Sequence, residues 1–268
     1  MSGGVFYLPH GGGPLPLMGD AGHASMVALY HELAGAIAGS PAVVVVTAHW
    51  EAEHTMFSGA ARPGMLFDYY GFPPETYTYS YPAPGAPALA ERATGLLKAA
   101  GVEAGIDDER GYDHGTFVPM MLLRPEADVP VLQMSLLKSL DATQHIAVGR
   151  ALAPLLADGI VIIGSGMSFH NLGAFLGGRR IPENADRHFD DWLNDVLVGS
   201  GHDADARAQR LANWVEAPGA RACHPREEHL LPLHVCFGAA SAAGVTAGNI
   251  FREPLMGYMT SGFAWHMA

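Results

Sequence analysis

Three apolar segments of the chain have the pattern of buried β-strands, and each of them leads to a histidine. They cover residues 5–8, 43–46 and 159–163, and the histidines that follow are His10, His49 and His170. Residues 43–46 are four consecutive valines, and β-branched side chains favour strands over helices. The segments do not alternate between polar and apolar residues, which is typical of parallel strands covered by helices on both faces.

Between and after these strands, apolar residues recur at helical spacing. We expect helices over residues 23–38, 86–100, 117–123, 141–157, 183–198, 203–215 and 230–243, and a further strand over 129–136. Residues 246–251 and 255–265 alternate like edge strands or a hairpin. The pattern predicts one α/β domain over residues 1–268, with a central, mostly parallel mixed sheet, helices on both faces and a C-terminal antiparallel edge.

Residues 58–85 follow neither period. The segment combines several prolines and glycines with many tyrosines and phenylalanines. Long connections without secondary structure are usually functional or disordered, and this aromatic content disfavours disorder. We therefore expect a long ordered loop over a binding site.

Composition excludes several classes of partner. The net charge of −12 argues against nucleic acid and against an anionic membrane surface. No apolar run approaches the roughly 20 residues that span a bilayer. Cys223 and Cys236 are too far apart for a C-x-x-C motif, and the first residues lack the features of a signal peptide. We expect a cytoplasmic protein, either a monomer or a homodimer.

The fourteen histidines are the feature that calls for a chemical explanation. Functional groups of open α/β sheets lie beyond the carboxyl ends of the strands, where His10, His49 and His170 are expected. A further cluster, residues 224–229, combines two histidines with two glutamates before a helix. Imidazole suits zinc, iron, copper and nickel, and two histidines with one carboxylate are typical of non-haem Fe(II) oxygenases.

Two other motifs are incomplete. The run from His10 to Gly13 matches the oxyanion-hole motif of esterases, but no G-x-S-x-G nucleophile motif accompanies it. Gly164 and Gly166 begin a dinucleotide-binding G-x-G-x-x-G motif, but Phe169 stands at the third glycine. Neither a serine esterase nor a dinucleotide-binding protein is expected.

Six motifs in order along the chain resemble those of class III extradiol ring-cleaving dioxygenases, in particular the DOPA 4,5-dioxygenase type. The motifs are Leu8-Pro-His-Gly-Gly-Gly-Pro14, Thr47-Ala-His-Trp50, Asp68-Tyr-Tyr-Gly-Phe72, Tyr112-Asp-His-Gly-Thr-Phe117, Gly164-Ser-Gly-Met-Ser-Phe-His-Asn-Leu172 and His224-Pro-x-x-Glu-His229. Each motif alone is unspecific, but together they cover most of the chain.

The resemblance implies a metal site. His10, His49 and His229 would bind the ion, with Glu228 as the rival third ligand. His170 would act as acid and base, or as a fourth neighbour of the ion, and His114 would be a second histidine facing the substrate. The implied metal is Fe(II) in the active enzyme, with Zn(II) as an alternative in the isolated protein.

The implied reaction is cleavage of a catechol ring by O2 to a ring-opened semialdehyde. The expected substrate is DOPA-like or a related catecholic acid, with Tyr70 and Phe72 as substrate contacts. Candidate partners for a substrate carboxylate are Arg110, Arg124 and Arg226, and histidines expected to be structural are His23, His31, His224 and His234. Two alternatives stay open: a zinc hydrolase on the same scaffold, and an inactive relative that binds metal or aromatic compounds.

Overall fold

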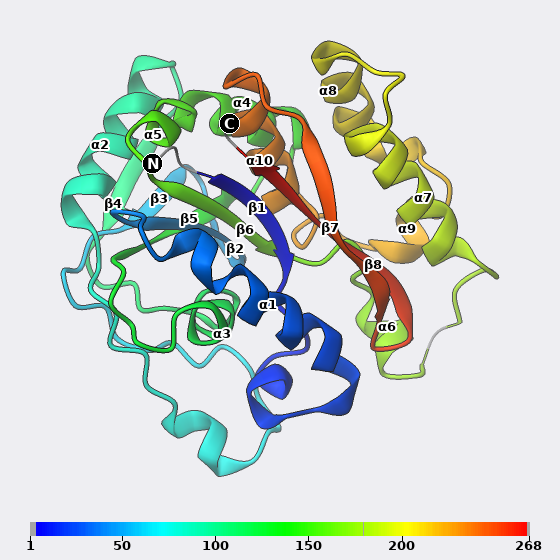
Figure 1. The fold of residues 1–268 in the computed structure, drawn as a ribbon, viewed down its shortest axis with the longest axis horizontal. Coiled ribbons are helices and arrows are strands. Elements are labelled where there is room, and N and C mark those ends of the chain that lie inside the picture. Colours follow the sequence, from blue (N-terminus) through cyan, green and yellow to red (C-terminus); the bar gives the residue numbers. More distant parts are fainter. Residues whose placement is uncertain (1–3, 179, 267–268) are drawn as a thin grey trace.

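An eight-stranded mixed sheet forms the centre of the protein, in a computed structural model that describes residues 4–178 and 180–266 (Figure 1). The strands are β1 (Gly4–Pro9), β2 (Val43–Ala52), β3 (Thr55–Ser58), β4 (Ala104–Asp107), β5 (Val131–Leu137), β6 (Val161–Gly166), β7 (Ala247–Leu255) and β8 (Tyr258–His266). Their order in the sheet is β4-β3-β5-β2-β6-β1-β8-β7. The parallel strands β5, β2, β6 and β1 lie in the middle, and the β7–β8 hairpin forms the expected antiparallel edge.

Helices cover both faces of the sheet (Figure 1). The helices are α1 (Ala24–Ile37), α2 (Pro87–Ala99), α3 (His114–Leu123), α4 (Ala142–Leu152), α5 (Pro154–Ala157), α6 (Leu172–Phe175), α7 (Ala185–Val198), α8 (Ala204–Ala212), α9 (Ala220–Cys223) and α10 (Leu231–Ala242). Helices α1 and α3 pack on one face, and α2, α4, α7 and α10 pack on the other, so that two separate apolar cores result. The predicted α/β architecture is confirmed. Within the described residues, no helix has the length and apolar character needed to cross a membrane.

The first two long strands are parallel, as the sequence predicts, but they are not neighbours. Strand β6 lies between β1 and β2 and pairs with both. The order of the strands therefore brings the ends of three strands together, those that lead to His10, His49 and His170. This arrangement places the candidate residues together at the carboxyl ends of the central parallel strands.

The sequence pattern did not predict the shortest helices and strands. Strands β3 and β4 have four residues each, and helices α6 and α9 are equally short. A window of four residues is too short to distinguish a period of 2 from one of 3.6. The segment 58–85 is a loop as expected, apart from Ser58, which ends β3, and one 3-10 turn, η3 (Pro74–Thr78).

Glycines allow α4 and α10 to cross at close range. A Cβ atom at Gly149 of α4 would lie 2.0 Å from the carbonyl oxygen of Val235, and one at Gly238 of α10 would lie 2.2 Å from that of Ile146. Backbone atoms have nowhere to move at such a contact, so any side chain at either position forces the helices apart. This close contact fixes α10, whose first turn follows the His224–His229 segment.

Replacing Gly149 with alanine tests this contact. We expect Gly149→Ala to lower the free energy of unfolding by about 1–3 kcal/mol, because the added methyl group meets the backbone of α10. Denaturant or thermal unfolding measures the change. The control is Gly95→Ala in α2, where nothing lies within 4 Å of the added atom; it should stabilise by about 0.5–1 kcal/mol through helix propensity. Equal effects of the two substitutions would contradict the close crossing.

Candidate active site

Five histidines line one cavity of about 790 Å³ at the carboxyl ends of the central strands. They are His10, after β1; His49, near the end of β2; His114, the first residue of α3; His170, after β6; and His229, before α10. The sequence predicts all five as site residues, and the structure places them around the same space. The rest of the lining is mainly apolar and aromatic, with Glu51, Arg226 and Glu228 at one side.

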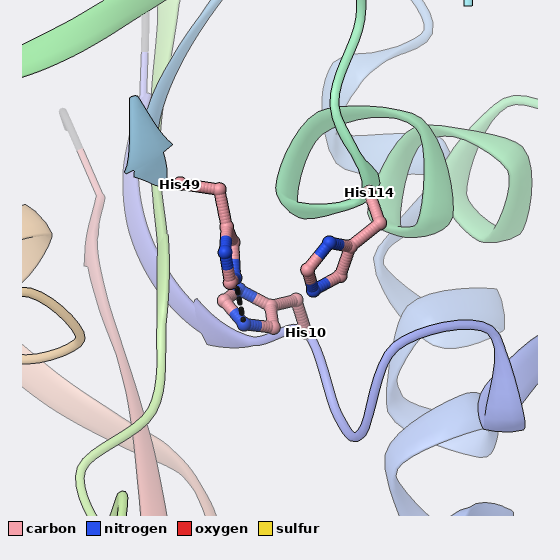
Figure 2. Close-up of side chains that lie close together, drawn as sticks. All are labelled: His10, His49 and His114. Carbon is pink, nitrogen blue, oxygen red and sulfur yellow. Dashed lines mark hydrogen bonds between the residues drawn. The ribbon is translucent and has the colours of Figure 1, made fainter. Parts of the chain in front are cut away.

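The rings of His10 and His49 face each other through their Nε2 atoms, which lie 3.1 Å apart (Figure 2). Ser165 determines the tautomer of His10. The Ser165 hydroxyl donates its hydrogen to the carbonyl of Gly115, so it accepts a hydrogen bond from Nδ1 of His10 at 3.0 Å. The hydrogen of His10 is therefore on Nδ1, and the lone pair of its Nε2 is directed at Nε2 of His49. Such a pair of nitrogens either shares one proton or faces a cation.

His114 is held by Asp68. The Oδ1 atom of Asp68 accepts hydrogen bonds from the backbone N–H of His114 at 2.9 Å and from its Nδ1 at 2.8 Å. Its Oδ2 lies 3.6 Å from Nδ1 of His49. Asp68 thus orients two imidazoles from the aromatic loop, and Figure 2 shows the rings of His10, His49 and His114 converging. Ligand atoms of these three histidines lie within 4.8 Å of one another.

Glu228 orients the other two histidines. Its Oε1 lies 3.0 Å from Nδ1 of His229 and 3.5 Å from Nδ1 of His170. The two imidazole rings are stacked, with centroids 3.3 Å apart. Ligand atoms of His170, Glu228 and His229 form a second group within 4.8 Å. Glu228 therefore lies beside the histidines in the position of a carboxylate that fixes ring orientation.

Close backbone contacts bring the His224–His229 segment onto the sheet. The carbonyl of His229 accepts hydrogen bonds from the hydroxyl of Tyr7 at 2.8 Å and from the backbone N–H of Met167 at 3.0 Å. A Cβ atom at Gly166 would lie 2.1 Å from that same carbonyl oxygen. Glycine is therefore required at the end of β6 for His229 to approach β1 and β6 at all.

Burial keeps the central imidazoles neutral. It lowers the pKa of His10, His49 and His229 well below the usual value, and the neighbouring histidines lower it further. Only the neutral imidazole has a free lone pair, so these three side chains are available as metal ligands at neutral pH. The two carboxylates behave oppositely. Burial raises the pKa of Asp68 and Glu228, but hydrogen bonds with His114 and His170 outweigh it and hold both below their usual values.

The aromatic loop contributes differently from residue to residue. Tyr70 and Phe72, the expected substrate contacts, both line the cavity, but Tyr70 is 90% exposed and lies at its mouth. Tyr69, which the sequence analysis did not select, is buried with its ring centroid 5.9 Å from that of His114. Its hydroxyl donates to the carbonyl of Thr76 at 2.5 Å. Which of two adjacent tyrosines faces the site depends on the loop conformation, so the sequence carries no signal for it.

Of the three candidate arginines, only Arg226 lines the cavity. Arg110 pairs with the buried carboxylate of Asp113 at 2.9 Å, and Arg124 pairs with Asp128 at 2.5 Å. Neither of them lines the cavity. Arg226 binds both carboxylate oxygens of Glu51, at 2.5 and 2.7 Å. Its charge is therefore already matched within the protein.

Other site residues were missed because they act through partners. Ser165 and Asp68 lie inside motifs quoted from the sequence, but nothing in the sequence indicates which histidines they contact. Both contacts depend on strand order and loop conformation. A serine beside glycines, like Ser165, or an aspartate before two tyrosines, like Asp68, is too common in sequences to indicate a contact with a particular histidine.

Comparisons with known proteins agree with these observations. Residues 4–264 match a family described as the catalytic LigB subunit of aromatic ring-opening dioxygenase. The chain is 44% identical over 257 residues to "Dioxygenase tasH" of Hapsidospora irregularis, covering 88% of this chain and 78% of the relative. It is 41% identical over 211 residues to a protein named 4,5-DOPA dioxygenase extradiol in Portulaca grandiflora, covering 74% and 72%.

Bacterial proteins extend the comparison. A protein of Escherichia coli K12 that carries the same 4,5-DOPA dioxygenase name is 35% identical over 200 residues, covering 74% of this chain and 72% of the relative. The crystal structure of an uncharacterized protein from Escherichia coli K12 superimposes with a TM-score of 0.76 at 27% identity. That similarity covers 97% of this chain and 98% of the other.

The four histidines that the sequence analysis expects to be structural lie outside the cavity. His23, His224 and His234 are buried and bonded to backbone groups, whereas His31 is exposed. His145 of α4 is buried as well: its Nε2 accepts from the N–H of Leu137 at 3.1 Å, and its Nδ1 donates to the carbonyl of Asp141 at 2.7 Å. Burial lowers the pKa of His145 to about 4.

This shift predicts a loss of stability in acid. Between pH 6.5 and about 4, the unfolded chain binds a proton at His145 and the folded protein does not. The contribution of neutral His145 to the free energy of unfolding is therefore fully present above pH 6.5. It is lost as the pH falls towards 4, by on the order of 3 kcal/mol. Unfolding measured at about pH 7 and about pH 4.5 should show a smaller acid-induced loss for His145→Gln. His31→Gln is the control, and an unchanged pH dependence in His145→Gln would contradict the assignment.

Proposed function

The chain belongs to the LigB family of extradiol ring-opening dioxygenases, and from this membership we propose that it cleaves the ring of a catechol with O2, using Fe(II) held by cavity histidines. The product would be a ring-opened semialdehyde. Relatives are named for DOPA, so DOPA and related catecholic acids are the first substrates to test. A cytoplasmic location and a monomeric or homodimeric state remain predictions from the sequence.

The observation that carries the proposal is the pair of facing nitrogens of His10 and His49. Their separation of 3.1 Å is close to that of two ligands at about 2.0–2.1 Å from a shared ion. Ser165 supports the pair by fixing the hydrogen of His10 on Nδ1. Metal-binding histidines usually have such a partner on the second ring nitrogen.

We propose His229 as the third ligand. Three imidazoles that would each hold one ion through a ring nitrogen are expected to have ring centres at similar distances from one another, about 4.5–5 Å. The centroid distances among His10, His49 and His229 are 4.9, 5.1 and 4.9 Å. With His114 in place of His229, the distances are 4.9, 5.4 and 3.8 Å, and the last is too short for two ligands of one ion.

Glu228 fits a supporting role better than that of a ligand. Its Oε1 is already 3.0 Å from Nδ1 of His229, and Arg226 lies 3.3 Å from its Oε2. A carboxylate in this position raises the basicity of the histidine and sets its tautomer. Bound Fe(II) would lower the pKa of a coordinated catechol hydroxyl and mediate electron transfer to O2, whereas Zn(II) at the same residues would be redox-inactive.

His170 and His114 are proposed to handle protons and position the substrate. Ring cleavage needs a base that removes a catechol proton and an acid that later returns one, and imidazole suits both tasks near neutral pH. Nδ1 of His170 lies 3.5 Å from Oε1 of Glu228, and this carboxylate would stabilise a positive charge that forms on the imidazole ring. His114 lies across the cavity, where Asp68 holds its Nδ1 hydrogen and leaves Nε2 free to contact a substrate oxygen.

The aromatic loop is proposed to hold the flat ring and to exclude water. The Tyr69 ring contacts those of Phe72 and Phe67 edge to face, at centroid distances of 5.5 and 6.1 Å. Phe72 and Tyr70 line the cavity and are the proposed substrate contacts. A zinc hydrolase and an inactive aromatic-binding relative are the rival functions. His114 and His170, each with a carboxylate partner, favour catalysis over simple binding of metal.

Metal reconstitution under anaerobic conditions tests the function. We expect the Fe(II)-loaded protein to consume O2 and form a yellow semialdehyde when a panel of catechols and then air are added, because only iron provides the required redox chemistry. The Zn(II)-loaded protein is the matched control and should do neither. If no catechol drives O2 uptake with either metal, the zinc-hydrolase or binding-protein reading takes the place of the dioxygenase.

Metal content of two variants tests the ligand set. His229→Ala should lower Fe(II) affinity by at least about tenfold, because one of three protein ligands is lost, while His114→Ala should retain the metal and lose turnover. Both residues are buried histidines beside a carboxylate, so each is a control for the other. Metal analysis after dialysis against a chelator gives the affinities. Loss of iron from His114→Ala, with retention in His229→Ala, would reverse the assignment.

A further inference from the structure

The cavity is larger than a catechol ring requires. Its volume of about 790 Å³ is in the range of roughly 300–1,000 Å³ that holds ligands of drug-like size. The five histidines occupy only one part of the lining. The remaining space is large enough for a substituent on a bound ring, and the side chains around it indicate which chemistry it would favour.

The mouth of the cavity is apolar although it faces water. Six large apolar side chains of the described residues are strongly exposed, and three of them, Tyr70, Leu172 and Leu176, line this one cavity. Leu172 is 60% exposed and Leu176 is 84% exposed. Single exposed apolar residues need no explanation, but a group of them at the entrance of a cavity marks a binding surface.

Aromatic packing against the β7–β8 hairpin holds the helix at this apolar mouth in place. Phe175 of α6 packs edge to face on Tyr258 of the β7–β8 hairpin, with centroids 5.7 Å apart, and the Tyr258 ring is stacked on Phe169 at 4.2 Å. Figure 1 shows α6 beside the tip of this hairpin. Helix α6 thus presents Leu172 on a fixed support, and Leu176 follows as its C-cap residue.

The charged side of the cavity disfavours an anion. Glu51, Arg226 and Glu228 form this side, which we call the acid–arginine cluster. Arg226 is the one lysine or arginine that lines the cavity among the described residues, and it is paired with both oxygens of Glu51 and with Glu228. The cluster has two carboxylates and one guanidinium, so its formal charge is −1. A carboxylate on the substrate would meet this negative side or the apolar mouth, and neither compensates its charge.

We propose that the substrate is an uncharged catechol with an apolar substituent of several carbon atoms, which lies against Tyr70, Leu172 and Leu176 at the mouth of the cavity. The inference rests on the proposed function, since it assumes that a catechol binds at the histidines. It departs from the catecholic acid that the sequence resemblance implies. Recognition comes from burial of alkyl or aryl surface, and discrimination against acids comes from the acid–arginine cluster.

Anaerobic titration of the Fe(II)-loaded protein tests the substituent, because binding is then measured without turnover. Catechols with ethyl, butyl and hexyl groups should bind with a Kd that falls roughly two- to fourfold for each added methylene group. Dihydroxyphenylpropionate should bind about tenfold more weakly than its neutral carboxamide, which has the same size and shape. This difference should shrink at high salt, since it arises from charge.

Two variants assign these effects to residues. In Leu172→Ala/Leu176→Ala, the advantage of the hexyl over the ethyl compound should fall by at least about fivefold, with ethylcatechol affected by less than about twofold. Both side chains are exposed, so their truncation does not disturb the core. Val215→Ala, an exposed apolar residue outside the cavity lining, is the matched control. Glu51→Gln should strengthen binding of the propionate about fivefold by freeing Arg226.

The outcomes separate this inference from the proposed function. If acids bind as tightly as their amides, or if the double variant retains the full effect of chain length, the inference is wrong. O2 uptake with catecholic acids at an efficiency equal to that with alkylcatechols would leave the dioxygenase function standing and the inference overturned. Absence of O2 uptake with every catechol would overturn the function itself.

Discussion

The site depends on one backbone contact, the approach of the His229 carbonyl to the end of β6. This carbonyl accepts hydrogen bonds from Tyr7 and from the N–H of Met167, and it lies where a side chain at Gly166 would be. The contact joins a segment from the last fifth of the chain to the edge of the sheet formed by β1, β2 and β6. Without it, Glu228 and His229 would lie apart from His10 and His49, and no common cavity would exist. A buried carbonyl with two donors is stable in this position because its hydrogen bonds replace those lost to water.

Five imidazoles in one cavity would repel one another if they were charged, so the protein keeps the central ones neutral and orients them. Burial lowers the pKa of His10, His49 and His229, and hydrogen-bond partners hold the Nδ1 hydrogens of His10, His114 and His229 away from the cavity centre. Ser165, Asp68 and Glu228 are those partners. The Nε2 lone pairs of these rings are therefore free to face the cavity, where a cation or a substrate oxygen would need them.

The cavity has two sides with opposite properties. One side is formed by the aromatic loop, α6 and the turn of the β7–β8 hairpin, and it is apolar out to the exposed Tyr70, Leu172 and Leu176. The other is the acid–arginine cluster, in which Arg226 is already neutralised by Glu51 and Glu228. The proposed chemistry at the histidines and the proposed selection of the substituent would therefore be carried by different elements. The histidines lie near the ends of strands of the sheet or at or just before the starts of helices packed on it, whereas the mouth is made of loops and a short helix.

The sequence by itself determined the α/β class, the long helices and strands, and the five histidines, because long apolar periods and short motifs are local properties of the chain. The strand β6 between β1 and β2, the short elements β3, β4, α6 and α9, and the inward position of Tyr69 were decided only by tertiary structure. Strand order depends on which apolar faces pack together across the whole sheet, and a four-residue element has no period of its own. The partners of the histidines were likewise beyond the sequence. Ser165 meets His10, and Asp68 meets His114 across 46 residues, because loops fold back onto the sheet, and no local pattern records such a contact.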